Sequence, residues 1–158
     1  MTQQLMTFSI AGERFAILLE CAQEVVRCEP VAPVPTLPPW IRGVMGLRSG
    51  AIPVVDLAVK FGGERSVLTT WSCVIIVQVR HGHEDTVLGL LIDEVGTLVE
   101  QAIQKTPEFG APVKLEFLRG VVNTDAGIAL VLDLDRVLSI EELLTATNAI
   151  AAVEGGRI

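Results

Sequence analysis

The residues with the clearest potential for chemistry are two histidines separated by one position. His81 and His83 are followed at once by Glu84 and Asp85. Two imidazoles at this spacing on the tip of a hairpin can converge on one zinc ion, and a nearby carboxylate can complete the ligand set. The same polar run is also typical of a solvated turn between two strands, which is the commoner structure. We therefore favour the turn and keep a metal site as the alternative.

A second candidate is a group of aspartates near the end of the chain. Asp133 and Asp135, beside Arg136, could form a carboxylate pair for acid–base chemistry. Asp133, however, has a counterpart in Asp56, because each follows an apolar run and precedes a leucine. Acid–base catalysis needs unlike environments for its two groups, whereas an aspartate that recurs at strand ends suits a cap for the following turn. We expect Asp56 and Asp133 to be structural caps.

Catalytic motifs are missing from the sequence. It has neither a Gly-x-Ser-x-Gly nucleophile motif nor the GxxxxGK[ST] pattern of a phosphate-binding loop. Its three cysteines include no Cys-x-x-Cys pair, which is typical of reduced, mostly buried thiols in a cytoplasmic protein; they are Cys21, Cys28 and Cys73. We therefore expect a protein that is not an enzyme and that holds no cofactor and no metal ion.

The composition indicates a folded, acidic protein of 158 residues. Half of the residues are hydrophobic and 20% are charged, so the chain can bury a core as one domain. The formal net charge of −7 disfavours nucleic acid and anionic lipid as partners, since both attract basic surfaces. No apolar run is long enough to span a bilayer, and the N-terminus lacks the basic residues of a signal peptide. These features predict a cytoplasmic protein without direct membrane insertion.

One stretch of the sequence occurs twice, at an offset of 77 residues. Residues 41–61 align without a gap with residues 118–138, and seven of the 21 aligned positions are identical. The chain is therefore expected to contain two copies of one β-rich unit. Gly43 and Gly120 are expected to hold backbone positions that a side chain cannot share. The identical pairs are Arg42/Arg119, Gly43/Gly120, Val44/Val121, Gly50/Gly127, Val54/Val131, Asp56/Asp133 and Leu57/Leu134.

Each copy opens with two apolar segments that predict a β-hairpin. Residues 6–10 alternate between apolar and polar side chains, and residues 15–19 return after a short turn. In the second copy, residues 73–79 and 87–92 form the corresponding pair around the polar turn that contains the histidines. The near-continuous apolar character of residues 73–79 is typical of a strand covered on both faces.

The remaining segments predict loops and one helix. Pro30–Pro39 and Lys105–Pro112 are rich in proline, which lacks the donor that a central strand requires, so each is expected to be an extended edge or a crossing loop. A helix is expected over approximately residues 139–153, because Ser139 and Glu142 have the spacing of a capping box. Its apolar face is expected to pack on the β-structure through Ile140, Leu143, Leu144 and Ile150.

Short strands with turns at regular spacing favour an all-β barrel class with a C-terminal helix. We expect a single domain over residues 1–158. Within it, subdomain one would cover approximately residues 1–70 and subdomain two approximately residues 71–138.

The centre of the first copy resembles the signature of the CheW family of chemotaxis coupling proteins. That signature runs roughly PxxPxxIxGVxNLRGxIxPVxDL. Its counterparts here are PVP at residues 33–35, PPWIRGVMGLR at 38–48 and IPVVDL at 52–57. Two positions depart from it, since Gly46 stands where the family has asparagine and Ser49 where it has glycine.

The resemblance extends over essentially the whole chain. Residues 8–17 look like the opening hairpin of the family, residues 23–25 like its VxEV turn, and residues 118–134 with the following helix like its close. It implies two similar small five-stranded β-barrels that share an apolar core, with a groove between them that receives a receptor tip. It also implies a non-enzymatic adaptor in the cytoplasm, recruited to receptor arrays at the inner face of the cell membrane. There, CheW-like proteins join the cytoplasmic tips of methyl-accepting receptors to the CheA histidine kinase, through the kinase's own CheW-like regulatory domain.

By this resemblance, three residues are expected to contact the receptor. Arg48 matches the arginine of the family's Leu-Arg pair, Glu24 matches the glutamate of the VxEV turn, and Ala22 occupies a position where the family usually has valine. An arginine at a strand end offers a rigid donor fork to carboxylates or helix-end carbonyls. Apolar walls between barrels suit the binding of a helix in a groove.

Two other functions remain as alternatives. Adaptors of the same family serve chemosensory arrays that control pili, gliding or surface sensing, and the sequence does not choose among these pathways. An alternative of another class is a β-barrel that binds a small ligand or a metal ion through His81 and His83.

Overall fold

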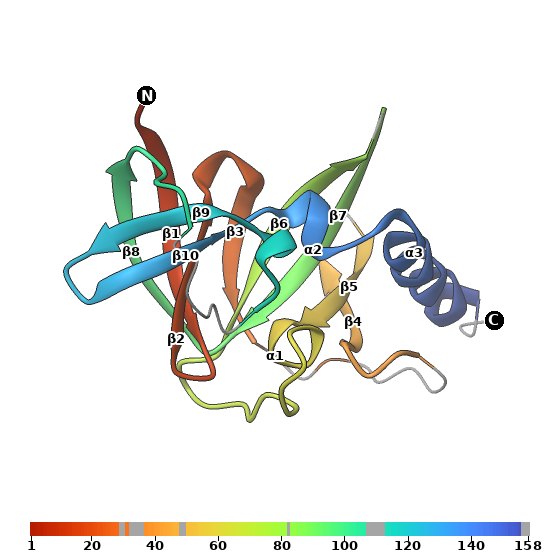
Figure 1. The fold of residues 1–158 in the computed structure, drawn as a ribbon. Helices are drawn as coiled ribbons and strands as arrows, with labels where there is room; N and C mark the ends of the chain where they lie inside the picture. Colours follow the sequence, from red (N-terminus) through yellow and green to blue (C-terminus); the bar gives the residue numbers. More distant parts are fainter. Residues whose placement is uncertain (29–30, 32–36, 48–49, 82, 107–112, 156–158) are drawn as a thin grey trace.

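The computed structural model describes residues 1–28, 31, 37–47, 50–81, 83–106 and 113–155 (Figure 1). Its strands are β1 (Gln3–Ile10), β2 (Glu13–Leu18), β3 (Ala22–Arg27), β4 (Ile41–Leu47), β5 (Gly50–Asp56), β6 (Cys73–His81), β7 (Glu84–Ile92), β8 (Glu94–Gln101), β9 (Leu118–Thr124) and β10 (Gly127–Leu132). Its helices are the short η1 (Leu19–Cys21), α1 (Leu57–Lys60), η2 (Leu115–Phe117) and α2 (Leu134–Val137), followed by the long α3 (Ile140–Gly155).

The strands form two five-stranded sheets. One has the order β8-β1-β2-β10-β9 and the other the order β3-β6-β7-β5-β4. Both expected hairpins are present, as β1–β2 and β6–β7, although the second extends to His81 and Glu84 and leaves a shorter turn than expected. The all-β class with a C-terminal helix is confirmed. Most of Pro30–Pro39 and Lys105–Pro112 lies outside the described residues.

The sequence repeat appears in the fold through an exchange of strands. The first copy supplies β1–β5 and the second supplies β6–β10, yet each sheet combines the hairpin of one copy with the last three strands of the other. The exchange occurs after β2, where η1 leads into β3 and β3 pairs with β6, and again after β7, where β8 pairs with β1. The expected boundary near residue 70 therefore separates the two sequence copies, whereas each sheet takes strands from both sides of it.

The two sheets enclose three apolar clusters. We call the sheet of β8-β1-β2-β10-β9 barrel 1 and the other barrel 2. Leu5, Val122 and Val131 belong to a cluster inside barrel 1, and Ile52 and Ile76 belong to one inside barrel 2. The largest cluster, here called the shared core, draws on both sheets; it includes Phe8, Phe15, Ile17, Val55, Ile75, Val77, Leu90 and Leu132. Strands between these clusters are covered on both faces, which explains their nearly continuous apolar sequences.

The repeated aspartates cap the short helices that follow β5 and β10. Asp56 accepts a hydrogen bond from the Ala58 backbone amide, and Asp133 accepts one from the Asp135 amide, both at 3.2 Å. The expectation of structural caps is confirmed.

A repeated arginine reaches each of these aspartates from the neighbouring strand. The Arg42 guanidinium lies 3.4 Å from the Asp56 carboxylate, and that of Arg119 lies 3.9 Å from Asp133. Both arginines sit where the strand register shifts by one residue, so the register shift, the arginine and the aspartate recur as a unit. Two of the seven identical pairs in the repeat, Arg42/Arg119 and Asp56/Asp133, thereby have one shared structural explanation.

Helix α3 begins with the expected capping box. The Ser139 hydroxyl accepts a hydrogen bond from the Glu142 backbone amide at 3.1 Å, and the Glu142 carboxylate accepts one from the Ser139 backbone amide at 2.9 Å. The expected apolar face is wrong in part, because the Leu144 side chain is 56% exposed while Leu143 and Ala146 are buried. A helix that packs on one side only needs a narrower apolar stripe than the sequence suggested. No helix among the described residues is long and apolar enough to cross a membrane.

Lys60 links helix α3 to the β-structure through one ion pair and contacts with two aromatic rings. Its ammonium group lies 2.6 Å from the Glu142 carboxylate, 5.9 Å from the Trp40 ring centre and 5.4 Å from the Phe117 ring centre. The position equivalent to Lys60 in the second copy is Val137. The ion pair is therefore peculiar to the first copy, and α3 packs against β4 and β5 at that end of the molecule (Figure 1).

Acidification is expected to loosen α3 before it unfolds the barrels. Burial alone would raise the pKa of Glu142, but hydrogen bonds from Lys60 and Ser139, together with the Lys60 charge, outweigh burial and lower it. Because this pKa is lower in the folded state, the contact stabilises the fold at neutral pH, and the stabilisation is lost as the pH falls through the folded-state pKa. The pair is partly exposed, so Glu142→Gln is expected to cost about 1 kcal/mol or less.

Hydrogen exchange of the α3 amides measures this effect. Glu142→Gln should show at neutral pH the lower protection factors, the ratio of intrinsic to observed exchange rate, that the unmodified protein shows only in acid. Glu141→Gln, at an exposed neighbouring position, should not. Unchanged exchange in Glu142→Gln, with unchanged pH dependence, would mean that the ion pair does not hold the helix.

Candidate docking site

A groove of about 830 Å³ opens into the interior of barrel 2. All five strands of that barrel contribute to its walls, so this groove belongs to one barrel, whereas the family resemblance implied a groove between the two. Ile52 and Ile76 form the floor and belong to the apolar cluster inside the barrel, while the exposed Glu24 adds a carboxylate at the rim. We call this the barrel-2 groove; its lining residues are Gln23, Glu24, Leu47, Gly50, Ala51, Ile52, Ile76 and Val87.

A β-bulge in β3 decides which side chains reach this groove. Ala22 pairs with Val77, but Glu24 pairs with Ile76, so one extra residue, Gln23, is inserted between them. In a regular strand, residues two apart share a face. The bulge instead turns Ala22 toward the shared core, where it is half-buried, and leaves Gln23 and Glu24 at the groove with Ile76.

The predicted receptor-contact residues therefore divide into two groups. Glu24 lines the groove and Ala22 does not. Arg48 lies outside the described residues, but Leu47 and Gly50, on either side of the undescribed residues 48–49, both line the groove. The structure thus brings Glu24 to the part of the chain that contains Arg48.

The equivalent place in barrel 1 is filled. Register places Thr7 where barrel 2 has Ile76, and β8 carries the matching bulge at Gly96 and Thr97. The Thr7 hydroxyl donates to the Thr97 carbonyl and accepts from the Thr97 amide, both at 2.8 Å. A side-chain carbon at Gly96 would collide with Thr7 and lie 3.2 Å from the Arg14 guanidinium. Two pseudo-equivalent barrels therefore differ at this position, and barrel 2 carries the open groove.

The apolar groove residues were not predicted from the sequence. Leu47, Ile52, Ile76 and Val87 each lie in an apolar run that also supplies core residues, and nothing in those runs marks one side chain as accessible. Their meeting depends on the exchange of strands and on the bulge in β3. The alternation of the sequence does not reveal either feature.

Metal chemistry finds no support in the part of the chain that the structure describes. No group of three histidine, cysteine, aspartate or glutamate side chains there lies close enough to hold an ion. None of the three cysteines, all of which lie in the described part of the chain, forms a disulfide. Each is half-buried, less buried than expected, and burial raises the pKa of each thiol. An apolar floor with a carboxylate at its rim is suited to docking an amphipathic protein segment.

Comparison with known proteins identifies the family. The model of the CheW-like domain matches residues 4–142. A probable chemotaxis protein CheW of Rhizobium etli is 29% identical over 140 residues, which cover 87% of this chain and 88% of that protein. The protein PilI of Pseudomonas aeruginosa is 30% identical over 122 residues, which cover 75% of this chain and 66% of that protein.

The fold agrees with a solved structure of the same family. The crystal structure of the scaffolding protein TtCheW from Thermoanaerobacter tengcongensis matches with a TM-score of 0.77 at 25% sequence identity, covering 90% of this chain and 91% of that one. Together with the barrels, their shared core and the repeated capping units, these matches show that the chain belongs to the CheW-like domain family, as a chemotaxis adaptor.

Proposed function

We propose that the chain is a non-catalytic adaptor that holds a CheA-type histidine kinase against the cytoplasmic tips of methyl-accepting receptors. The observation that carries this proposal is the barrel-2 groove, where Glu24 stands over an apolar floor beside the segment that contains Arg48. A receptor tip is an α-helical hairpin. Its apolar side would lie on Ile52 and Ile76, and its charged groups would meet Glu24 and Arg48 at the rim.

Ala22 has a different part in this proposal. It packs toward the shared core, on the other side of the bulge from Glu24. Its side chain would set the position of β3, and through β3 the position of Glu24, without touching the receptor itself.

The kinase would use a separate surface. Its regulatory domain is itself CheW-like, so the two partners would dock as barrel against barrel. Each contact of this kind is weak alone, and the multivalent array supplies the stability. In this account the adaptor resides in the cytoplasm, at receptor arrays on the inner face of the cell membrane.

Charge reversal at the groove tests the receptor contact. Arg48→Glu and Glu24→Arg are each expected to lower receptor-dependent kinase activation by about tenfold or more, because each puts a like charge opposite the receptor's own group. Binding to the isolated regulatory domain of the kinase should remain. A reconstituted assay with receptor tips, kinase and adaptor measures the activation, and circular dichroism checks the fold.

The second copy offers a matched control. Asp125 occupies the position equivalent to Arg48, on the exposed β9–β10 turn of barrel 1. Asp125→Arg is expected to leave activation within about twofold, since Thr7 and its hydrogen bonds to Thr97 occupy the matching place in barrel 1. If Arg48→Glu still gives full activation, Arg48 does not contact the receptor. If Arg48→Glu and Asp125→Arg lower activation equally, the barrel-2 groove is not the receptor site.

A second pathway is favoured by one comparison. The similarity to PilI, whose identity of 30% is as high as that of the CheW relatives, fits an adaptor of an array that controls pili. Binding of the purified chain to the regulatory domain of each candidate kinase, measured side by side, separates the two pathways. The expected result for the chemotaxis role is tighter binding to the chemotaxis kinase.

A further inference from the structure

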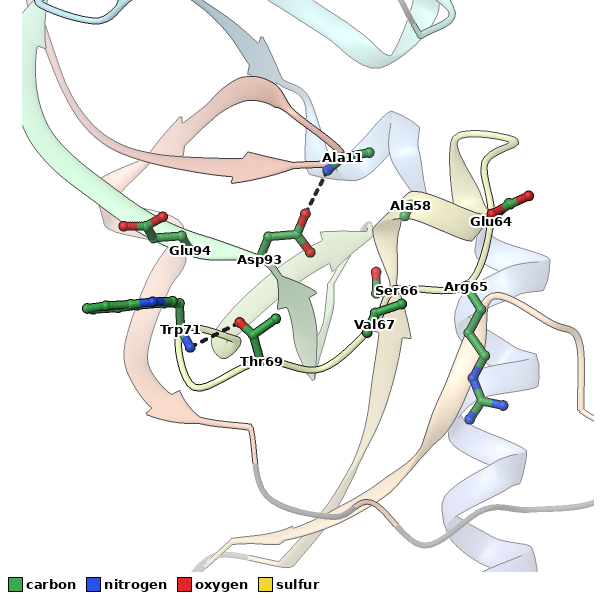
Figure 2. Close-up of a pocket in the computed structure, with 10 residues that line it drawn as sticks. All are labelled: Ala11, Ala58, Glu64, Arg65, Ser66, Val67, Thr69, Trp71, Asp93 and Glu94. Atoms are coloured by element: carbon green, nitrogen blue, oxygen red, sulfur yellow. Dashed lines mark hydrogen bonds between the residues drawn. The ribbon is translucent and has the colours of Figure 1, made fainter.

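A second cleft lies on another part of the molecule and involves none of the groove residues. It has a volume of about 530 Å³ and is walled on one side by residues 62–72, here called the Trp71 loop, which connects α1 to β6. The other wall is formed by Asp93, which connects β7 to β8, by Glu94 at the start of β8, and by the turn between β1 and β2 (Figure 2). We call it the Trp71 cleft.

The Trp71 loop is held firmly although it carries exposed apolar side chains. Ser66 donates two hydrogen bonds to the Asp56 carboxylate, from its amide at 2.9 Å and from its hydroxyl at 2.7 Å. At the other end, the Trp71 amide donates to the Thr69 hydroxyl at 3.1 Å. Yet Val67 is 80% exposed and Trp71 is 67% exposed. Because the loop backbone is already fixed, a partner that binds there orders less of the chain, and tryptophan is enriched among the residues that dominate interfaces.

The loop has no counterpart in the second copy. The equivalent positions there belong to Ser139 and helix α3, and the residue equivalent to Ser66 is Leu143. The internal symmetry of the fold therefore does not require this loop, its serine anchor or its exposed indole.

The cleft is acidic, and its carboxylates have no ion-pair partner among the described residues. Glu64, Asp93 and Glu94 are among its lining residues, against the single basic residue Arg65. Within the described residues, none of the three carboxylates forms an ion pair. Asp93 accepts one hydrogen bond at 2.7 Å from the Ala11 amide, which fixes the position of its carboxylate.

The arrangement of Trp71 and Glu94 indicates the charge of the missing partner. Figure 2 shows the indole below Glu94, with a ring face turned toward that carboxylate, while Arg65 extends away from both. The face of an indole carries negative electrostatic potential, so a carboxylate over it gains nothing by itself. A cation between the two gains from both, and the planar guanidinium of arginine can stack on the ring while it binds the carboxylate.

We propose that the Trp71 cleft docks a segment of a partner protein that places an arginine between Trp71 and Glu94. Small apolar residues on either side of this arginine pack on Val67 and Ala58. Charge complementarity selects this occupant, because the cleft offers carboxylates and an aromatic face to a cation. An acidic or uncharged segment would gain neither contact. The proposal is independent of the receptor groove, since the two sites share no lining residue.

A peptide titration followed by NMR tests the cleft on the full chain. The probe is the acetylated, amidated tripeptide Val-Arg-Val, and its matched control is Val-Gln-Val, which keeps the apolar neighbours without the charge. The chain has two tryptophans, so the variant Trp71→Phe assigns the indole signals. Val-Arg-Val is expected to shift the Trp71 indole signal with a Kd on the order of 1 mM, and the Trp40 signal should stay in place.

Two variants locate the contact. Glu94→Gln should weaken binding of Val-Arg-Val by about fivefold, whereas Glu84→Gln, an exposed acid on the β6–β7 hairpin, should leave it unchanged. The proposal fails if the Trp71 signal does not move by about 10 mM peptide, if Val-Gln-Val binds equally well, or if Glu94→Gln binds as tightly as the unmodified chain.

Discussion

Gly120→Val is expected to remove a large part of the stability of the fold. A side-chain carbon at Gly120 would overlap the Gln104 carbonyl oxygen and lie 2.6 Å from the Ile103 side chain, and the φ of 156° at this glycine disfavours any side chain. Gln104 is also paired with Val121 through two backbone hydrogen bonds, of 2.9 and 2.8 Å. Because the clash is with backbone, the neighbouring segment must move, and those two bonds must weaken.

The expected loss is about 3 kcal/mol or more, or roughly 6–12 °C in melting temperature for a chain of this size. Urea unfolding and thermal melting measure it. Gly120→Ala already carries the clashing carbon, so it should show most of the loss. Gly46→Ala is the control, since a side-chain carbon there meets nothing within 4 Å and the melting temperature should hardly change. An unchanged melting temperature in Gly120→Val would contradict the close approach.

The sequence was sufficient for the local structure and for the internal symmetry. The ungapped offset predicted twin units, and the recurrence of Asp56 as Asp133 predicted the caps, because both features depend on residues close together in the chain. Hairpins and the capping box of α3 were predictable for the same reason. The error at Leu144 arose because periodicity gives the direction of an apolar face but not its width.

The exchange of strands and the apolar parts of the docking surfaces were not predictable, although the family resemblance pointed to Glu24. In the short β3, the sequence AQEVVR pairs with β6 of the second copy, although its own copy offers equally apolar strands as partners. The bulge that separates Ala22 from Glu24 leaves no mark in the side-chain types. Similarly, nothing in the sequence marks Trp71 as exposed, and only the tertiary structure shows it exposed beside Glu94. Each of these features depends on contacts between segments that are distant in sequence.

Asp56→Ala is expected to destabilise the fold far more than the same change at its twin Asp133. The Asp56 side chain is 1% exposed and accepts hydrogen bonds from Ala58, from the amide and hydroxyl of Ser66 and from Arg42. Asp133 is 17% exposed, and its two arginine partners lie at 3.9 and 3.7 Å. Removal of Asp56 leaves the Arg42 charge, itself 11% exposed, without its counter-ion in a nearly dry site.

Comparison of the two aspartates therefore separates the helix cap that they share from the buried ion pair and hydrogen bonds that Asp56 adds. Loss of the cap alone predicts that Asp133→Ala lowers the free energy of unfolding by about 1 kcal/mol. Loss of the cap and of a buried ion pair predicts that Asp56→Ala lowers it by about 3–5 kcal/mol. Urea midpoints of the two variants measure this difference. Because Ser66 holds the Trp71 loop to Asp56, hydrogen exchange at Ser66 should also rise in Asp56→Ala and stay unchanged in Asp133→Ala. Equal costs at both positions would show that the buried network around Asp56 adds nothing beyond the cap.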